Sequence, residues 1–426
     1  MKAIIDCNNF YCSCERLFRP DLKHKPVVVL SNNDGCIISM SDEAKKLGIK
    51  MATPFFLAKK IIEEQQVTTF SSNYNLYGDL SRRVMETVKT ILPEDCVEVY
   101  SVDEAFLDLS HIPAEQLTET AFNIRKRVEL WTGISVSIGI APTKTLAKVA
   151  NHMAKKDKKG TDCIMVLDTV EKITDALQKT PAGDIWGVGS RKALKLENVG
   201  IVDAWQLKQM PEEWARQHLG GVVGVRLIKE LRGVPAIELE EQLKTKKMIT
   251  TTRMFGCPVT ELKDVHEAVA TYISRAAEKL RRQRSAAKMI TVYVVPKEAG
   301  DQVKYKHGPT QSSSIILPAA TSDSALLIKP AMSLVEKLFK KGNIYKKAGV
   351  ILSALEPDKS IQANLFVPPG ENVRRHLMNT LDNINFSMRD DIVKFASSGT
   401  KKDWKMRQEL RSNRYTTRWE ELKQIR

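Results

Sequence analysis

The sequence predicts a multidomain α+β protein, and three features lead to this prediction. At 426 residues the chain is too long for one hydrophobic core and is expected to form about three domains with short extra segments. Apolar runs typical of strands lie among helical patterns without regular alternation, which favours α+β over a parallel α/β sheet. After a basic hinge at 244–247, the pattern over 246–355 reads strand, helix, strand, strand, helix, strand.

The composition favours a polyanionic partner. The formal net charge is +15, and a balance this basic makes nucleic acid the first expectation. No apolar run approaches the roughly 18 residues of a membrane span, and the N-terminus enters a strand directly, so neither a span nor a signal peptide is expected. The seven cysteines lack paired Cys-x-x-Cys spacing, so we expect reduced thiols in a cytoplasmic protein.

Three acids interrupt or end apolar segments. Met1–Asp6 predicts a short buried strand that ends on an acid, and Val99–Leu109 predicts a strand or tight hairpin interrupted by Asp103 and Glu104. Strand side chains alternate between faces, so a turn or bulge must separate these two acids if both point the same way. If the two segments are neighbours in one sheet, Asp6 lies next to Asp103. Such oxygen ligands suit Mg²⁺, although an isolated Asp-Glu pair is more often a solvated turn.

The segments around these acids predict further strands and helices. Lys25–Leu30 and Cys36–Met40 are expected as strands joined by a turn at 31–35, and a helix follows at 41–47. Later patterns predict helices over 74–92, 122–131 and 143–154 and a strand over 134–140. The last helix is expected to present Lys144, Lys148 and Lys155. Lysines on a helix that follows a strand suit a phosphate group.

Two further regions predict contacts with nucleic-acid phosphates. In the block 168–238, Gly187-Val188-Gly189 leads into a basic helix, a turn that presents backbone N–H groups without reading bases. This turn resembles a helix-hairpin-helix, and Leu219–Gly224 is a second candidate. In the 246–355 region, the helix expected at 262–284 ends in a cationic cluster: Arg275, Lys279, Arg281, Arg282, Arg284 and Lys288. These cations either hold phosphates in a salt-dependent way or complement the helix dipole in water.

Two of these motifs together resemble a known enzyme family. The segment Asp6–Tyr11 after a buried strand, with Tyr100–Asp108, is similar to the palm of the Y-family translesion DNA polymerases. The resemblance extends from Met1 to about residue 355, and Asn8, where many members carry a second Asp, indicates the UmuC-type branch, the catalytic subunits of bacterial DNA polymerase V. It implies error-prone, template-directed synthesis by two-metal transfer of a nucleotide to a primer 3′-hydroxyl, within an SOS-type response to DNA damage.

The resemblance also implies a right-hand polymerase architecture. Its parts would be a palm at 1–20 and 74–167, small fingers at 21–73, a helical helix-hairpin-helix thumb at 168–240, a β-α-β-β-α-β little finger at 246–355 and a tail at 356–426. The thumb would grip the minor groove of primer–template DNA. A sheet face of the little finger would lie in the major groove.

Specific residues take roles from the same resemblance. Asp6, Asp103 and Glu104, with the backbone carbonyl of Cys7, would hold two Mg²⁺ ions. A deoxynucleoside triphosphate would be bound by Phe10, Ile38, Ser39, Lys45 and Lys155, with Tyr11 as the steric gate against ribonucleotides. Phe10 is equally consistent with a core position, and Lys45 with a solvated helix face. Asp42 stands where archaeal members carry a tyrosine that touches the phosphates, so the resemblance does not extend to the contact made by that tyrosine. DNA contacts are expected from Gly187, Gly189, Arg191, Lys192, Arg281, Arg282 and Arg284.

The tail loses its regular periods after Glu356 but contains a short recognisable peptide. Gln362, Leu365 and Phe366 lie in an extended, proline-bounded segment that can place two apolar anchors in a pocket, and it resembles a sliding-clamp-binding motif. Lys401–Arg426 is basic and rich in aromatic residues. It is similar to the C-terminal extension of UmuC-type subunits, which implies docking of an accessory subunit and a recombinase filament.

Two functions of different classes remain open at this stage. The first is the error-prone DNA polymerase, a cytoplasmic enzyme associated with the nucleoid. The second is a non-catalytic DNA-binding adaptor that is recruited to the sliding clamp. The presence of all three acids favours the polymerase.

Overall fold

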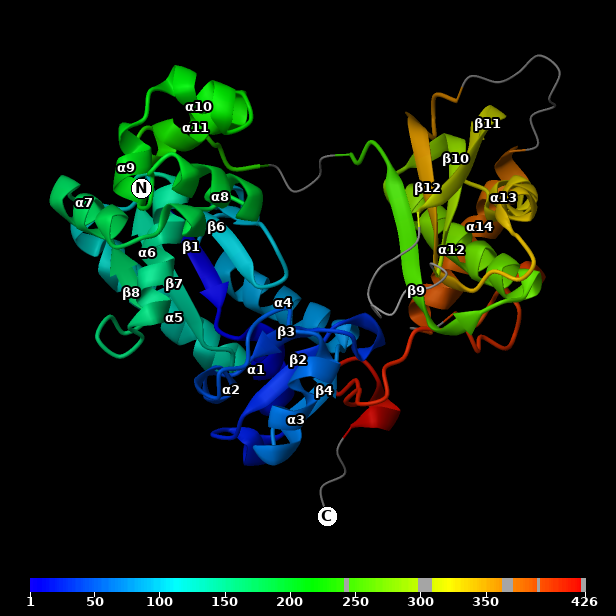
Figure 1. The fold of residues 1–426 in the computed structure, drawn as a ribbon, viewed down its shortest axis with the longest axis horizontal. Coiled ribbons are helices and arrows are strands. Elements are labelled where there is room, and N and C mark those ends of the chain that lie inside the picture. Colours follow the sequence, from blue (N-terminus) through cyan, green and yellow to red (C-terminus); the bar gives the residue numbers. More distant parts are fainter. Residues whose placement is uncertain (241–244, 298–308, 362–370, 389–390, 423–426) are drawn as a thin grey trace. The chain divides into compact units, whose positions relative to one another are not determined.

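The computed structural model describes residues 1–240, 245–297, 309–361, 371–388 and 391–422 (Figure 1). The chain forms two compact units. Unit 1 comprises Met1–Leu30, Ile37–Leu243 and Leu410–Arg426, and unit 2 comprises Ser31–Cys36 and Lys244–Glu409. Within the described ranges, no helix has both the length and the apolar character needed to cross a membrane.

The largest sheet of unit 1 is built around the N-terminal strand. Its five strands have the order β5-β6-β1-β7-β8. They span β1 Lys2–Cys7, β5 Val97–Val99, β6 Glu104–Asp108, β7 Val136–Ala141 and β8 Ile164–Val166. Strand β1 is antiparallel to both β6 and β7, and β8 runs parallel to β7. Because β1 lies between β6 and β7, it is almost wholly buried, as its apolar composition predicts.

The two faces of this sheet pack against different sets of helices. Ala3 and Ile5 of β1 lie in one hydrophobic core, whereas Ile4 lies in another. The first core includes α1 Phe10–Leu17, α4 Tyr74–Lys89 and α5 Leu117–Thr132, and the second includes α6 Lys144–Lys156. Because strand side chains alternate, Asp6 leaves the sheet on the same face as Ile4, toward α6.

A smaller sheet follows the predicted strand pair. It has the order β3-β2-β4, with β2 Val27–Leu30, β3 Ile37–Met40 and β4 Thr68–Ser71. The strands expected at 25–30 and 36–40 and the helix expected at 41–47, here α2 Asp42–Lys46, are confirmed. Helix α3 Phe55–Glu64 and the edge strand β4 were not predicted. Strand β4 runs parallel to β2, and α3 forms part of the connection between them.

The rest of unit 1 between 168 and 240 is helical. Its helices are α7 Val170–Gln178, α8 Ser190–Asn198, α9 Ala204–Gln209, α10 Glu212–His218 and α11 Val222–Leu231. Helix α8 begins directly after Gly187-Val188-Gly189, and α11 begins directly after Gly220-Gly221. Gly187 and Gly220 have φ values of +92° and +95°, a region that glycine reaches without a Cβ clash. Both predicted turns therefore open onto a helix.

Unit 2 has the predicted strand and helix order. Its elements are β9 Ile249–Val259, α12 Leu262–Arg282, β10 Ser285–Pro296, β11 Gln311–Thr321, α13 Ser324–Leu338 and β12 Tyr345–Pro357. The strands form an antiparallel sheet in the order β11-β10-β12-β9, and α12 and α13 pack together in its core. The α+β fold class is confirmed.

The tail differs from the irregular segment that the sequence predicts. Helix α14 Glu371–Ser387 follows β12 within unit 2, and Met378 on it is buried. Further along, Trp404 lies in the core of unit 2, with its ring 6.4 Å from Phe255 and 5.9 Å from Tyr272. From Leu410 the chain belongs to unit 1. The expectation of lost regular structure after Glu356 is therefore wrong.

Short 3-10 helices complete the description. They are η1 Pro20–Leu22, η2 Asn32–Asp34, η3 Glu94–Cys96, η4 Ala114–Gln116, η5 Ala182–Asp184, η6 Ala396–Ser398 and η7 Trp419–Glu421. All seven cysteines are free.

Candidate active site

Two acids face each other across neighbouring strands of the large sheet. The register of β1 and β6 pairs Asp6 with Glu104, one position away from the expected pairing with Asp103. Asp6 is only 7% exposed. The shift arises because the Cys7 N–H donates to the Asp103 carbonyl at 2.8 Å, which fixes the register just before β6 begins.

Asp103 lies in a bend that precedes β6. The hydroxyl of Ser101 donates to Asp103 Oδ1 at 2.6 Å, so this carboxylate is held by its own loop. The bend supplies the change of direction that strand alternation requires between Asp103 and Glu104. In the part of the chain that the structure describes, no group of three or more His, Cys, Asp or Glu side chains is placed to hold a metal ion. Asp6 and Glu104 line one cleft, and Asp103 is not among its lining residues.

Helix α6 places polar side chains opposite Asp6 and Glu104. Lys155 Nζ lies 2.5 Å from Asp6 Oδ2, and Lys148 Nζ lies 2.7 Å from Glu104 Oε1. Asn151 Nδ2 lies 3.5 Å from Asp6 Oδ2. These three residues are spaced 148, 151 and 155, which is one face of a helix. The family resemblance assigned a nucleotide contact to Lys155 and gave no role to Asn151, although a spacing of four residues places Asn151 and Lys155 on one helix face.

The charges at this site depend on one another. Burial raises the pKa of Asp6 to about 7, Glu104 acts in the same direction, and the ammonium of Lys155 opposes both. An ionised Asp6 therefore needs a nearby positive charge. Among the described residues, the buried Oδ1 atom of Asn151 has no hydrogen-bond partner. Two close carboxyl groups and an unpartnered oxygen form a donor set that fits a divalent cation.

A cleft of about 240 Å³ opens at these residues within unit 1. Its lining residues are Asp6, Glu104, Lys148, Val149, Asn151, His152, Lys155, Thr180, Asp184 and Trp186. Lys148 Nζ also lies 4.9 Å from the centre of the Tyr100 ring and 5.7 Å from that of Trp186. Trp186 Nε1 donates to Tyr100 Oη at 3.2 Å. Aromatic faces attract a cation, so these rings hold the Lys148 ammonium beside Glu104.

Tyr11 lies in an aromatic cluster and Phe10 lies in the core. The Tyr11 ring stacks on Tyr77 at 4.6 Å and 17°, and meets Tyr74 edge-on at 6.0 Å. Phe10 is 3% exposed, which favours the core alternative for this residue. Burial raises the pKa of Tyr11 to about 12, so its hydroxyl stays protonated at neutral pH.

Lys45 belongs to a small polar cluster around Asp42. Its Nζ lies 2.6 Å from Asn9 Oδ1 and 3.1 Å from Asp42 Oδ1, and Lys158 Nζ lies 2.5 Å from Asp42 Oδ2. Burial alone would raise the pKa of Asp42, but hydrogen bonds from Lys158, Asn9 and Lys45 hold it well below its usual value. Asp42 therefore fixes the ends of two lysines. Ser39 is buried and accepts from the Cys12 N–H at 3.4 Å.

Other residues with expected roles are placed as follows. Ile38 is partly buried against the core of the large sheet, and Asn8 Oδ1 accepts from Ser137 Oγ at 2.8 Å. Arg191 is exposed near the start of α8, while Lys192 Nζ donates to the Gly187 carbonyl at 3.2 Å. Gln362, Leu365 and Phe366 of the expected clamp peptide lie outside the described residues.

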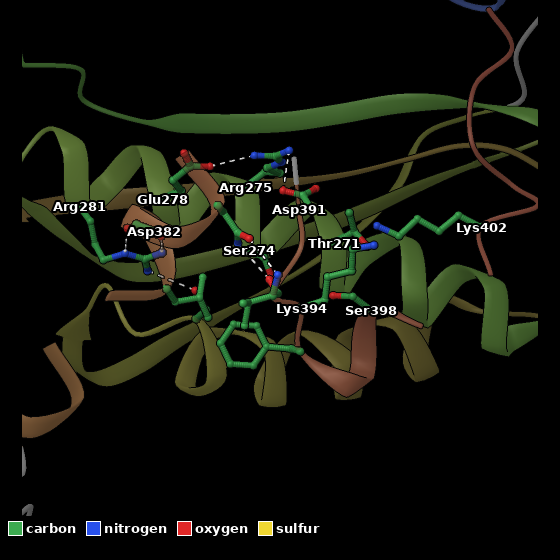
Figure 2. Close-up of a pocket in the computed structure, with 15 residues that line it drawn as sticks. Thr271, Ser274, Arg275, Glu278, Arg281, Asp382, Asp391, Lys394, Ser398 and Lys402 are labelled. Atoms are coloured by element: carbon green, nitrogen blue, oxygen red, sulfur yellow. Dashed lines mark hydrogen bonds and ion pairs between the residues drawn. The ribbon is translucent and has the colours of Figure 1, made fainter. Parts of the chain in front are cut away.

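The cationic cluster at the end of α12 is divided by ion pairing. The Arg281 guanidinium makes two contacts with Asp382 of α14, at 2.6 and 2.7 Å (Figure 2). It also donates to the Ser322 carbonyl at 2.6 Å. Its side chain is 7% exposed, so this arginine is occupied within unit 2 and not directed at a phosphate. Arg282 is 62% exposed, and Arg284 is also exposed. Arg275 and Lys279 of the same cluster are exposed as well.

Comparison with known proteins gives a consistent family. Residues 5–152 match the impB/mucB/samB family, residues 246–365 match its C-terminal domain, and residues 375–425 match a domain of unknown function, DUF4113. Protein UmuC of Salmonella typhimurium is 40% identical over 431 residues, with 100% of each chain covered. DNA polymerase IV of Brucella melitensis is 30% identical over 360 residues, covering 83% of this chain and 76% of that protein.

A solved structure shows a similar fold. The Y-family DNA polymerase chimera Dbh-Dpo4(243-245)-Dbh superimposes with a TM-score of 0.66 at 22% identity, covering 83% of this chain and 99% of that one.

Proposed function

The chain belongs to the impB/mucB/samB family, and from this premise we propose that it is an error-prone, template-directed DNA polymerase that performs translesion synthesis. Its substrates are primer–template DNA and deoxynucleoside triphosphates. The observation that carries the proposal is the pairing of Asp6 with Glu104 in a cleft that also holds Lys148 and Lys155. A buried pair of acids balanced by two lysines is unfavourable for stability and suits a reaction that moves negative charge.

The acids are proposed to hold Mg²⁺. Asp6, Glu104, Asp103 and the Cys7 carbonyl would be the protein ligands, since the donor set at the cleft fits a divalent cation. Two bound ions would lower the pKa of the primer hydroxyl and stabilise the charge on the leaving pyrophosphate. Mg²⁺ usually takes only one or two protein carboxylates and leaves other positions to water and substrate phosphates. A site with two gathered acids is compatible with that preference.

The remaining residues bind and orient the nucleotide. Lys155 and Lys45 are proposed to contact the triphosphate, because each ammonium lies partly exposed beside an acid that the substrate can replace. Tyr11 is proposed to exclude the 2′-hydroxyl of a ribonucleotide, with Ile38 and Ser39 near the incoming base. Lys148, held by aromatic rings and by Glu104, orients that acid. Phe10 supports Tyr11 from the core.

The proposed partners extend this role. The turns before α8 and α11 would bind duplex phosphates through backbone N–H groups, and Arg282 and Arg284 would add charge contacts. The peptide with Gln362, Leu365 and Phe366 would bind the sliding clamp. By its family, the chain would also work with an accessory subunit and a recombinase filament, in the cytoplasm at the nucleoid. Resistance to DNA damage is the expected physiological role.

Primer extension across a defined lesion tests the proposal. Wild-type chain with Mg²⁺, the clamp and the accessory proteins is expected to extend the primer, and the Asp103→Ala plus Glu104→Ala variant is expected not to. A matched control is Glu94→Ala plus Asp95→Ala, an adjacent acid pair exposed in η3. Equal extension by the two double variants would refute the site. No extension by wild type under any partner condition would instead favour the DNA-binding adaptor.

A further inference from the structure

The C-terminal segment Leu410–Tyr415 docks on unit 1 beside the edge strand β4. The Ser71 N–H donates to the Leu410 carbonyl at 3.1 Å, the Leu410 N–H donates to Ser71 Oγ at 2.9 Å, and Ser71 and Arg411 form a parallel bridge. The segment therefore adds a short extension to the edge of the small sheet. An edge strand offers unpaired backbone groups, which is why an extended segment binds there.

Side chains fix the register of this segment. Asn73 Nδ2 donates to the Ser412 carbonyl and Oγ, both at 3.0 Å, and to the Asn413 carbonyl at 3.2 Å. The ring of Tyr415 stacks on Phe18 at 4.5 Å and 15°. Phe18 directly follows α1, so the segment contacts both the strand edge and the helix that carries Tyr11. Several directional contacts make this a specific docking, not a loose wrapping.

A continuous chain of contacts leads from the segment to the nucleotide gate. Ser412 Oγ donates to Glu15 Oε1 at 3.0 Å, and Tyr77 Oη donates to the same oxygen at 2.6 Å. Glu15 is 1% exposed and lies on α1, four residues after Tyr11. The Tyr77 ring in turn stacks on Tyr11. One buried carboxylate oxygen thus holds both the tail and the ring on which Tyr11 rests.

The geometry points to a positioning role: we propose that Leu410–Tyr415 sets the position of Tyr11 through Ser412, Glu15 and Tyr77, and so contributes to discrimination between deoxyribose and ribose. This inference rests on the proposed gate role of Tyr11. The physical reason is that Glu15 Oε2 is buried without a partner among the described residues, so Oε1 carries the hydrogen bonding of this carboxyl group. Loss of the Ser412 donor loosens the shared acceptor and the Tyr77 ring bound to it.

The test measures kcat/KM for a ribonucleotide and for the matching deoxynucleotide, using the full chain with its partners. Ser412→Ala is expected to shift the ratio toward the ribonucleotide by about fivefold, the equivalent of one net hydrogen bond. Ser412→Thr keeps the hydroxyl and is expected to restore the wild-type ratio. Tyr415→Ala, which removes the stack on Phe18, is expected to act in the same direction as Ser412→Ala. Glu420→Ala, an exposed tail residue, is the control.

Measurements in the Tyr11→Ala background separate the positioning role of Leu410–Tyr415 from the gate role of Tyr11. If the tail acts through the gate, Ser412→Ala has no further effect on the ratio once Tyr11 is removed. A relaxed ratio in Tyr11→Ala with an unchanged ratio in both tail variants overturns the tail inference and leaves the gate intact. An unchanged ratio in Tyr11→Ala overturns the gate, and with it the proposed route from the tail. A fall in both kcat/KM values at constant ratio indicates a merely structural tail and also overturns the inference.

Discussion

Two basic helices, α6 in unit 1 and α12 in unit 2, look alike in sequence but use their cations differently. On α6, Lys155 pairs with Asp6 while keeping 35% of its side chain exposed at an open cleft. On α12, Arg281 pairs with Asp382 at 7% exposure and is fixed by a further bond to Ser322. The first pair lies open at the cleft, where we propose that Lys155 exchanges Asp6 for a substrate phosphate, whereas the second pair closes a packing contact. Exposure and the number of partners, not the density of basic residues, distinguish a binding cation from a structural one.

The largest expected effect is the loss of stability on removal of Arg281. Arg281→Ala leaves Asp382 partly buried and unpaired, which is expected to reduce the free energy of unfolding by about 3–5 kcal/mol. Thermal unfolding of the full chain measures this, with Arg282→Ala as the exposed control. Equal melting temperatures for the two variants would show that the two arginines do not differ as the structure indicates.

On α6 the expected effect falls on substrate binding. Lys155→Ala removes a charged hydrogen bond to the triphosphate and is expected to raise KM for the deoxynucleotide about 10- to 100-fold. The melting temperature should change less than in Arg281→Ala, because Asp6 has a pKa of about 7 and can take up a proton when Lys155 is removed. Steady-state primer extension measures KM, and Lys156→Ala, the exposed neighbour on α6, is the control. An unchanged KM would assign Lys155 to the fold, like Arg281.

Burial of Asp6 beside Lys155 on α6 predicts that stability depends on pH. The pKa of Asp6 is about 7 in the folded chain and near 3.8 when exposed, so the folded state holds this proton more tightly and loses stability as pH rises through that window. Asp6→Asn cannot ionise. In buffer with a chelator, it is expected to unfold at a higher temperature than wild type at pH 8 and to match it at pH 4. A variant less stable than wild type at pH 8 would contradict a strained acid at the cleft.

The smallest effect concerns the salt dependence of DNA binding. Arg282→Ala and Arg284→Ala each remove one exposed cation, and each is expected to reduce the slope of log affinity against log salt by about 1. Fluorescence anisotropy with labelled duplex at several salt concentrations measures the slope. Arg275 shares Glu278 with Arg282 but also pairs with Asp391, so it is the comparison position, and its replacement is expected to change the slope less. Three equal slopes would show that Arg275 contributes to DNA binding as much as Arg282 and Arg284 do.

Local patterns predicted much of the fold but not the partners that are distant in sequence. The apolar run ending at Asp6 predicted β1, and the order of six elements in unit 2 followed from periodicity. The register of Asp6 against Glu104 was missed by one residue, because a backbone bond from Cys7 to Asp103 determines it. The assignment of Arg281 to DNA failed because its partner Asp382 is 101 residues away on α14, a helix that was not predicted.

The tail shows the same limit. Its resemblance to the extension of UmuC-type subunits implied docking of other proteins. Two of its aromatic residues contact their own chain, because Trp404 packs in unit 2 and Tyr415 packs on Phe18. An aromatic residue in a basic segment does not indicate by itself whether its partner is another chain or its own. Trp419 is 86% exposed and remains the better candidate for an external contact.

The central claim is that Asp6 and Glu104 converge to form a polymerase centre, and Glu104→Gln tests it most directly. This change keeps the size of the side chain and removes its charge, so kcat/KM for lesion-crossing extension is expected to fall about 10²–10³-fold with an unchanged melting temperature. Extension within twofold of wild type, at any Mg²⁺ concentration, would contradict the claim.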